Sequence, residues 1–139
     1  FGNPVLAGQA IYQGNCTACH SVNGDRGTGP TWLNSVGSVH EMASGEQVLV
    51  DYDYVLESIW FPNNRIVAGF QAGIMPQNYR SVFSEPQIRQ IFAYMCSLSD
   101  RWQEVEGCLE YAPQIQEARG EAPAEAPADA AAALVDDGN

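Results

Sequence analysis

The chain has 139 residues, 45% of them hydrophobic, which suits one domain whose core a large bound group would help to fill. Seventeen acidic residues stand against six basic ones, all arginines, and the net charge of −11 argues against nucleic acid and anionic membrane surfaces as partners. No apolar run is long enough to cross a bilayer, so membrane association is expected only through a parent complex.

The first predicted element is a helix that begins at Pro4 and continues through "AGQAIYQGN", with Leu6, Ala10 and Ile11 at helical spacing. Residues 21–50 are rich in Gly, Ser, Thr and Asn and show no sustained period. We therefore expect a long ordered loop with short turns. A loop of this length inside a compact domain suggests that something fills it.

A second helix is predicted for "DYDYVLESIWFP", where Asp51 is a good N-cap and acidic residues crowd the first turn. Its inward-facing side chains are expected to be Val55, Leu56 and Ile59. Residues 62–84 contain Gly, Pro and Asn and form another predicted loop.

The segment "SEPQIRQIFAYMCSLS" gives the clearest helix, with Ser84 as its cap and Pro86 in its first turn. One stripe of this helix is expected to be buried: Ile88, Ile91, Phe92, Met95 and Leu98. Three main helices, long loops and almost no strand signal predict an all-α fold around a bound group.

The composition changes near the C-terminus. From Pro113 onward the chain is built mainly from Ala, Glu, Pro and Asp and has no aromatic residue. Such a segment buries too little apolar surface to offset its ordering entropy. We place the folded domain at residues 1–111 and a solvated acidic tail at residues 112–139. The alternative is an arm that orders against a partner, because "AAAALV" has good helix propensity.

The motif "CTACH" joins Cys16, Cys19 and His20, and C-x-x-C-H is a specific signal for covalent haem c. Two thiols one helical turn apart can both bond to the vinyl groups on one side of a haem, and the adjoining histidine can bind the iron. The alternatives are a redox-active dithiol and half of a zinc site. A dithiol motif would follow a strand rather than a helix, and the remaining cysteines and His40 lie at poor spacing for zinc.

A second axial ligand must come from Met42, Met75, Met95 or His40. Met95 lies on the buried stripe of the last helix, where methionine usually fills the core, and Met42 and His40 lie in a polar loop. Met75 is favoured because glycine precedes it in "AGIMPQNY" and Pro76 stiffens the chain after it. His40 and an open iron position are the alternatives. Thioether plus imidazole would raise the reduction potential above that of two imidazoles.

These segments resemble class I c-type cytochrome domains, most closely the cytochrome c domain of subunit II in caa3-type cytochrome c oxidases. The resemblance runs from about Gly8 to Ser99 and depends on "GQAIYQGNCTACHSVNGDRGTGPTWLNSVG", "DYVLESIWFPNNRIVAGF", "IMPQNY" and "IRQIFAYMCSLS". It implies one haem c that transfers electrons in an aerobic respiratory chain, in the periplasm or on the outer face of the cytoplasmic membrane. The implied partners are an electron donor and the copper or haem centre of an oxidase, with no catalysis by the domain itself.

The resemblance also implies roles for individual residues. Cys16 and Cys19 would carry the thioethers, His20 and Met75 would bind the iron, and the Pro30 carbonyl would accept the Nδ1 proton of His20. Further residues are candidates to line the haem edge or to hold its propionates: Trp32, Trp60, Arg65, Asn78 and Tyr79.

Two features of the sequence bear on the partner. The sequence does not include the copper-binding domain and membrane hairpin of subunit II, so we expect either an excised domain of that subunit or a free-standing relative, such as a subunit of alternative complex III. A haem peroxidase or gas sensor is a further alternative from another class. The lysines that often ring a cytochrome's haem edge are also missing, so a different docking surface is expected.

Two pairs of contacts complete the predictions. The resemblance implies that Gly8 and Tyr12 pack against Ile91 and Tyr94 where the first and last helices cross. Outside the haem motif the sequence has two more cysteines, Cys96 and Cys108. Because haem c is attached outside the cytoplasm, where thiols oxidise, we predict a disulfide between them, with two buried free thiols as the alternative.

Overall fold

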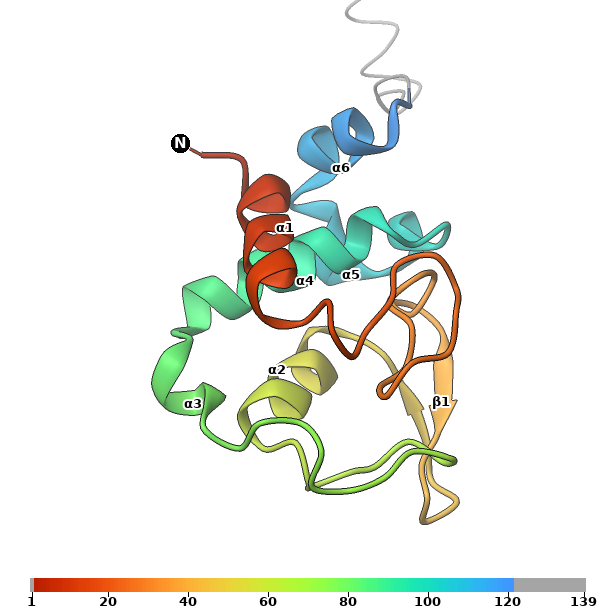
Figure 1. The fold of residues 1–139 in the computed structure, drawn as a ribbon. Coiled ribbons are helices and arrows are strands. Elements are labelled where there is room, and N and C mark those ends of the chain that lie inside the picture. Colours follow the sequence, from red (N-terminus) through yellow and green to blue (C-terminus); the bar gives the residue numbers. More distant parts are fainter. Residues whose placement is uncertain (1, 122–139) are drawn as a thin grey trace, which may run out of the picture.

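The computed structural model describes residues 2–121, and within this range the chain is mainly helical with long loops (Figure 1). In chain order the elements are α1 (Pro4–Asn15), β1 (Val39–Glu41), β2 (Gln47–Leu49), α2 (Tyr52–Trp60), α3 (Tyr79–Val82), α4 (Glu85–Ser97), the 3₁₀ turn η1 (Trp102–Glu104), α5 (Glu106–Leu109) and α6 (Ala112–Arg119). The predicted all-α class is confirmed. Within residues 2–121, no helix is both long and apolar enough to cross a membrane.

Helices α1 and α4 cross at close range, as Figure 1 shows. Gly8 lies at the crossing, where an added Cβ would lie 2.6 Å from the carbonyl carbon of Gln90 and closer still to its oxygen. The Tyr12 and Tyr94 rings pack with their centroids 5.6 Å apart. The predicted contact between these helices is therefore confirmed, and the missing side chain at Gly8 is what permits it.

The buried face of α1 is not the one that carries the residues noted at helical spacing. Leu6 is 56% exposed and Ala10 also faces solvent, whereas Val5, Gly8 and Tyr12 are buried. The reason is the glycine: α4 can approach α1 only on the face that carries Gly8, so the residues one turn before and after Gly8 become the buried ones.

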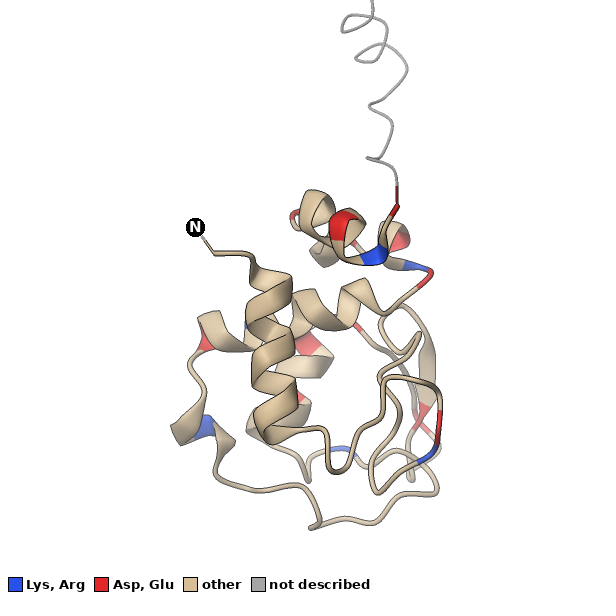
Figure 2. Cartoon of the chain, turned by 45° about the horizontal axis from the view of Figure 1, so that its top comes forward, with Lys and Arg blue, Asp and Glu red and all other residues tan. Residues whose placement is uncertain are grey.

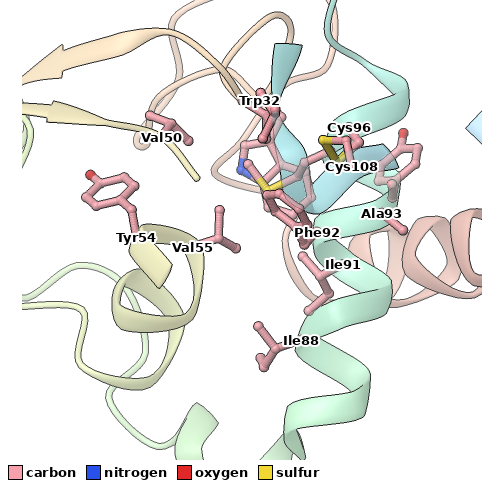
Figure 3. Packing of buried hydrophobic residues seen from close by; sticks show 14 of the residues in the cluster. Trp32, Val50, Tyr54, Val55, Ile88, Ile91, Phe92, Ala93, Cys96 and Cys108 are labelled. Carbon is pink, nitrogen blue, oxygen red and sulfur yellow. A yellow bond between two sulfur atoms is a disulfide. The ribbon is translucent and has the colours of Figure 1, made fainter. Parts of the chain in front are cut away.

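The other two helices begin where their caps predict. The Asp51 carboxylate accepts a hydrogen bond from the Tyr54 N–H at 2.9 Å, and Ser84 forms a capping box with Gln87. The inward faces of α2 and α4 turn toward each other in Figure 3, with Val50, Tyr54 and Val55 opposite the α4 stripe. Most residues of the predicted stripes are buried, and two are only partly so: Leu56 and Leu98.

The loop predicted over residues 21–50 contains a short antiparallel hairpin. Strands β1 and β2 pair with His40 opposite Val48, and Gly45, at φ +93°, lies in the connecting turn. A bridge between Met42 and Val67 then joins this hairpin to the second long loop. Strands of three residues are too short to leave a clear alternating pattern, which is why the sequence did not indicate them.

The chain after residue 99 is tied back onto α4. The predicted disulfide between Cys96 and Cys108 is present, and both cysteines are fully buried (Figure 3). The predicted domain boundary at residue 111 falls just before α6, whose Ile115 is 0% exposed, so packed structure continues to the end of this helix. The tail prediction for residues 122–139 lies outside the described residues.

Arg119 holds the end of α4. Its guanidinium donates to the carbonyl oxygens of Ser97 and Ser99 at 3.0 and 3.1 Å and pairs with Asp100 at 2.7 Å. The helix carrying Arg119 lies at the top of Figure 2, where acidic and basic side chains are marked. In the same view α1 is tan along its whole length, because it contains no charged residue.

Candidate cofactor site

A cavity of about 380 Å³ lies between the segment after α1, the two long loops and the inner faces of α2 and α4. This volume is in the range of small-molecule and cofactor sites. Eight of the residues singled out in the sequence line it: Cys16, Cys19, His20, Pro30, Trp32, Arg65, Met75 and Tyr79. The structure thus brings together residues that are up to 63 positions apart in the sequence, from Cys16 to Tyr79.

The His20 ring is held in one orientation. Its Nδ1 lies 2.7 Å from the Pro30 carbonyl oxygen, as expected, and the ring stacks at a tilt on Trp32 with centroids 5.4 Å apart. An added Cβ at Gly29 would lie 2.5 Å from His20 Cε1, so only glycine leaves room for the ring. Because a carbonyl can only accept, the proton is on Nδ1 and Nε2 keeps its lone pair.

The charge state of His20 suits metal binding. Burial lowers the pKa of His20, and its hydrogen bond to the Pro30 carbonyl acts in the opposite direction. The imidazole is therefore neutral near pH 7, and a neutral imidazole is the form that binds a metal.

The thiols of Cys16 and Cys19 are not joined to each other in the structure. Burial, with a smaller contribution from Cys19, raises the pKa of Cys16 to about 11. Redox-active C-x-x-C motifs instead have a cysteine pKa below the ordinary value, because the thiolate is the reactive form. This counts against the dithiol alternative. The Cys16 thiol is therefore protonated near pH 7, the form that adds to a vinyl group.

Hydrogen bonds hold the C-x-x-C-H motif against the last turn of α1. The Cys16 N–H donates to the Tyr12 carbonyl, which makes Cys16 the C-cap of the helix. The Tyr12 hydroxyl donates to the His20 carbonyl at 2.6 Å, and the Gly29 N–H donates to the Cys19 carbonyl at 2.8 Å. The crossing of α1 over α4 therefore fixes where the thiols and the histidine lie.

The candidates for a second iron ligand differ in whether they line the cavity. Met42 is 2% exposed and does not line the cavity; the Tyr54 hydroxyl donates weakly to its sulfur at 3.9 Å. Met75, Met95 and His40 do line it. Met42 is thereby removed from the set, and the choice falls among these three residues.

Asn63 holds the loop that carries Met75. Its side-chain oxygen accepts from the Gly73 N–H at 3.0 Å, and its amide nitrogen donates to the Gln77 side chain at 3.2 Å. Gln77 in turn donates to the Met75 carbonyl at 2.7 Å. Asn63 was not singled out in the sequence, although it lies in a segment of the resemblance, because its partner Gly73 is ten residues further along the chain. The only feature of the sequence that could have indicated this contact is the presence of amide side chains on both sides of the loop.

Of the remaining predicted residues, two line the cavity and two do not. The Tyr79 hydroxyl donates to the Asn15 carbonyl at 3.2 Å, beside the thiols, whereas Arg65 lies 3.7 Å from Glu46 and 3.6 Å from Glu57. Two of the weaker candidates do not line the cavity: Trp60, whose Nε1 donates to the Phe83 carbonyl, and Asn78. The structure therefore does not place Trp60 and Asn78 in the cavity wall, and Trp60 is turned toward the start of α4.

A model of the cytochrome c family matches residues 5–99, a span that contains the C-x-x-C-H motif and every predicted site residue. The chain belongs to the cytochrome c family. A search of curated proteins finds no match for it. Membership implies that this cytochrome c carries covalently bound haem c and transfers electrons to and from redox partners.

The residues present fit that group. The cavity offers two free thiols next to each other, a neutral imidazole with a free nitrogen, and walls made largely of apolar side chains. His40 Nδ1 is in addition buried without a hydrogen-bond partner among the described residues, which is a position that a bound polar group would satisfy. When bound, the haem supplies an iron that alternates between its ferric and ferrous states.

Proposed function

We propose that this cytochrome c is a single-haem electron carrier of an aerobic respiratory chain, with His20 and Met75 as the axial ligands. The observation that carries the proposal is that His20 and Met75 line one cavity, each held in place by hydrogen bonds to its own loop. A single C-x-x-C-H motif supports one haem. Met75 is preferred to Met95 because a loop can place a thioether over a flat ring, whereas Met95 is fixed on the buried stripe of α4.

The resemblance to the subunit II domain supports a place in a caa3-type oxygen reductase, where the acceptor would be the copper or haem centre of the oxidase. A free-standing cytochrome or a subunit of another respiratory complex is the alternative. The Cys96–Cys108 disulfide supports a location outside the cytoplasm, in the periplasm or on the outer face of the membrane, because such bonds persist in oxidising compartments.

The charge around the cavity supports a redox partner that does not dock through an acidic patch, because such a patch would need lysines on this protein. Arg65 is the one charged residue that lines the cavity in the part of the chain that the structure describes, and residues 2–24 contain none. Electron transfer would then occur by close approach of the partner to an uncharged surface beside Cys19. The excess acid of the whole molecule favours a basic partner at longer range.

Replacing Met75 with leucine tests the axial ligand. Leucine keeps the volume but has no sulfur, so we expect complete loss of the weak long-wavelength band of thioether-ligated ferric haem and a lower reduction potential. Absorption spectra and potentiometric titration of the purified holoprotein measure both. Met95→Leu is the matched control, since Met95 lines the same cavity, and it should keep the band. A band that survives in Met75→Leu and disappears in Met95→Leu would show that the two roles are reversed.

A further inference from the structure

We propose that His40 binds a carboxylate of the haem through Nδ1, and that this contact couples protonation of His40 to reduction of the iron. The inference rests on the proposed function, because it requires haem in the cavity. It assigns to His40 a role at the edge of the cofactor in place of the axial role that the sequence left open.

The starting observation is an unsatisfied nitrogen. His40 lies on β1 and lines the cavity, and its Nδ1 is buried with no hydrogen-bond partner among the described residues. Burial lowers the pKa of His40, and no neighbouring carboxylate acts against this. A buried imidazole nitrogen without a partner is disfavoured, so the complete site should supply one.

Among residues 2–121, none on this wall is a suitable hydrogen-bond partner for His40 Nδ1. The Tyr54 ring meets His40 edge-on, with centroids 6.3 Å apart, but its hydroxyl is directed to the Met42 sulfur. Within the described residues, no carboxylate lines the cavity. Arg65 is already flanked by Glu46 and Glu57, which leaves its charge partly neutralised.

A bound haem would supply the missing hydrogen-bond acceptor. Haem carries two propionate carboxylates on the edge opposite its vinyl groups. The vinyl edge is fixed by Cys16 and Cys19, next to Tyr79 and Asn15. His40 and Tyr54 come from a different part of the fold, the hairpin and α2, and their rings meet edge-on in the cavity wall. An Nδ1–H of His40 that donates to a propionate would satisfy both groups.

The contact would couple a proton to the electron. Reduction lowers the charge of the iron site by one, which favours the protonated form of a nearby histidine. The pKa of His40 is therefore higher in the ferrous protein, and by reciprocity protonation raises the reduction potential. The potential should fall as pH rises between these two pKa values. The other ionisable groups near His40 are Tyr54, which burial keeps neutral, Arg65 with its two glutamates, and Arg26, which shares a second, smaller cavity with His40.

The test uses the haem-loaded protein and three variants of the full chain. Reduction potentials are measured by spectroelectrochemistry between about pH 5 and pH 8, the range in which histidine titrates. We expect the reduction equilibrium of the wild type to shift several-fold across this range. His40→Gln and His40→Phe should flatten the profile. Glu41→Gln is the control: Glu41 is exposed, ionisable and adjacent on β1, and its loss should leave the slope unchanged.

A second measurement does not depend on the variants. NMR titration of the histidine side chains in the wild type should give His40 a higher pKa in the ferrous than in the ferric protein. Equal pKa values in the two states, or a slope that persists in His40→Gln, would overturn the inference while an intact thioether band leaves the proposed function standing. Wild-type protein without covalent haem or without that band would overturn the proposed function itself.

Discussion

Gly8→Ala should lower the free energy of unfolding by about 3 kcal/mol or more, at the upper end of the cost of overpacking a core. The new methyl group would collide with the backbone of Gln90 and lie 2.9 Å from Tyr94 Cβ. A flexible side chain can move aside at small cost, but the Gln90 carbonyl belongs to the hydrogen-bonded ladder of α4. The helices must therefore separate. Urea denaturation of the holoprotein, followed by far-ultraviolet circular dichroism, measures the loss.

Gly14→Ala provides the matched control for that experiment. Gly14 lies on the same helix, and an added Cβ there meets nothing within 4 Å. Alanine is favoured over glycine in a helix by up to about 1 kcal/mol, so this variant should be as stable as the wild type or more so. If both variants shifted the unfolding midpoint equally, helix propensity would account for the result and the close crossing would not.

The crossing also determines the site. Cys16 caps α1, and the Tyr12 hydroxyl binds the His20 carbonyl, so a shift of α1 on α4 moves both the thiols and the histidine. We therefore expect Gly8→Ala to broaden the NMR resonances of His20 as well as to lower the free energy of unfolding.

Features written in short stretches of sequence were predicted well. Asp51 and Ser84 begin their helices because a cap acts on backbone groups within three residues. The C-x-x-C-H motif is equally local, and the disulfide followed from the compartment in which such a motif is matured. The contact between His20 and Pro30 was available only through the resemblance, since ten residues separate them.

Features that depend on distant contacts were missed. The spacing on α1 allowed either face to be buried, and only the approach of α4 to Gly8 decides against Leu6. The support that Asn63 gives to the Met75 loop and the bridge between the two long loops join segments that carry no common pattern. His40 was weighed as an iron ligand, and its unsatisfied nitrogen became visible only when β1 placed it in the cavity wall.

Removing the disulfide should cost about 3 kcal/mol of stability, because Cys96 and Cys108 close a loop with a sequence separation of 12. The cross-link restricts the unfolded chain, and opening it restores that freedom. Cys96→Ala, Cys108→Ala and the double variant should all unfold at lower urea concentration. Their visible haem spectra should match the wild type, since no residue after Met95 lines the cavity in the described part of the chain.

The comparison of single and double variants separates the cross-link from packing. Either substitution alone abolishes the bond, so each should cost nearly as much as both together. Both sulfurs are fully buried, and a purely packing contribution would instead make the two losses add. Arg119 still binds the carbonyls of Ser97 and Ser99 in every variant, which should keep α6 docked on α4. Stability would then fall mainly by the entropy of the loop, and a double variant that loses twice as much as either single variant would contradict this account.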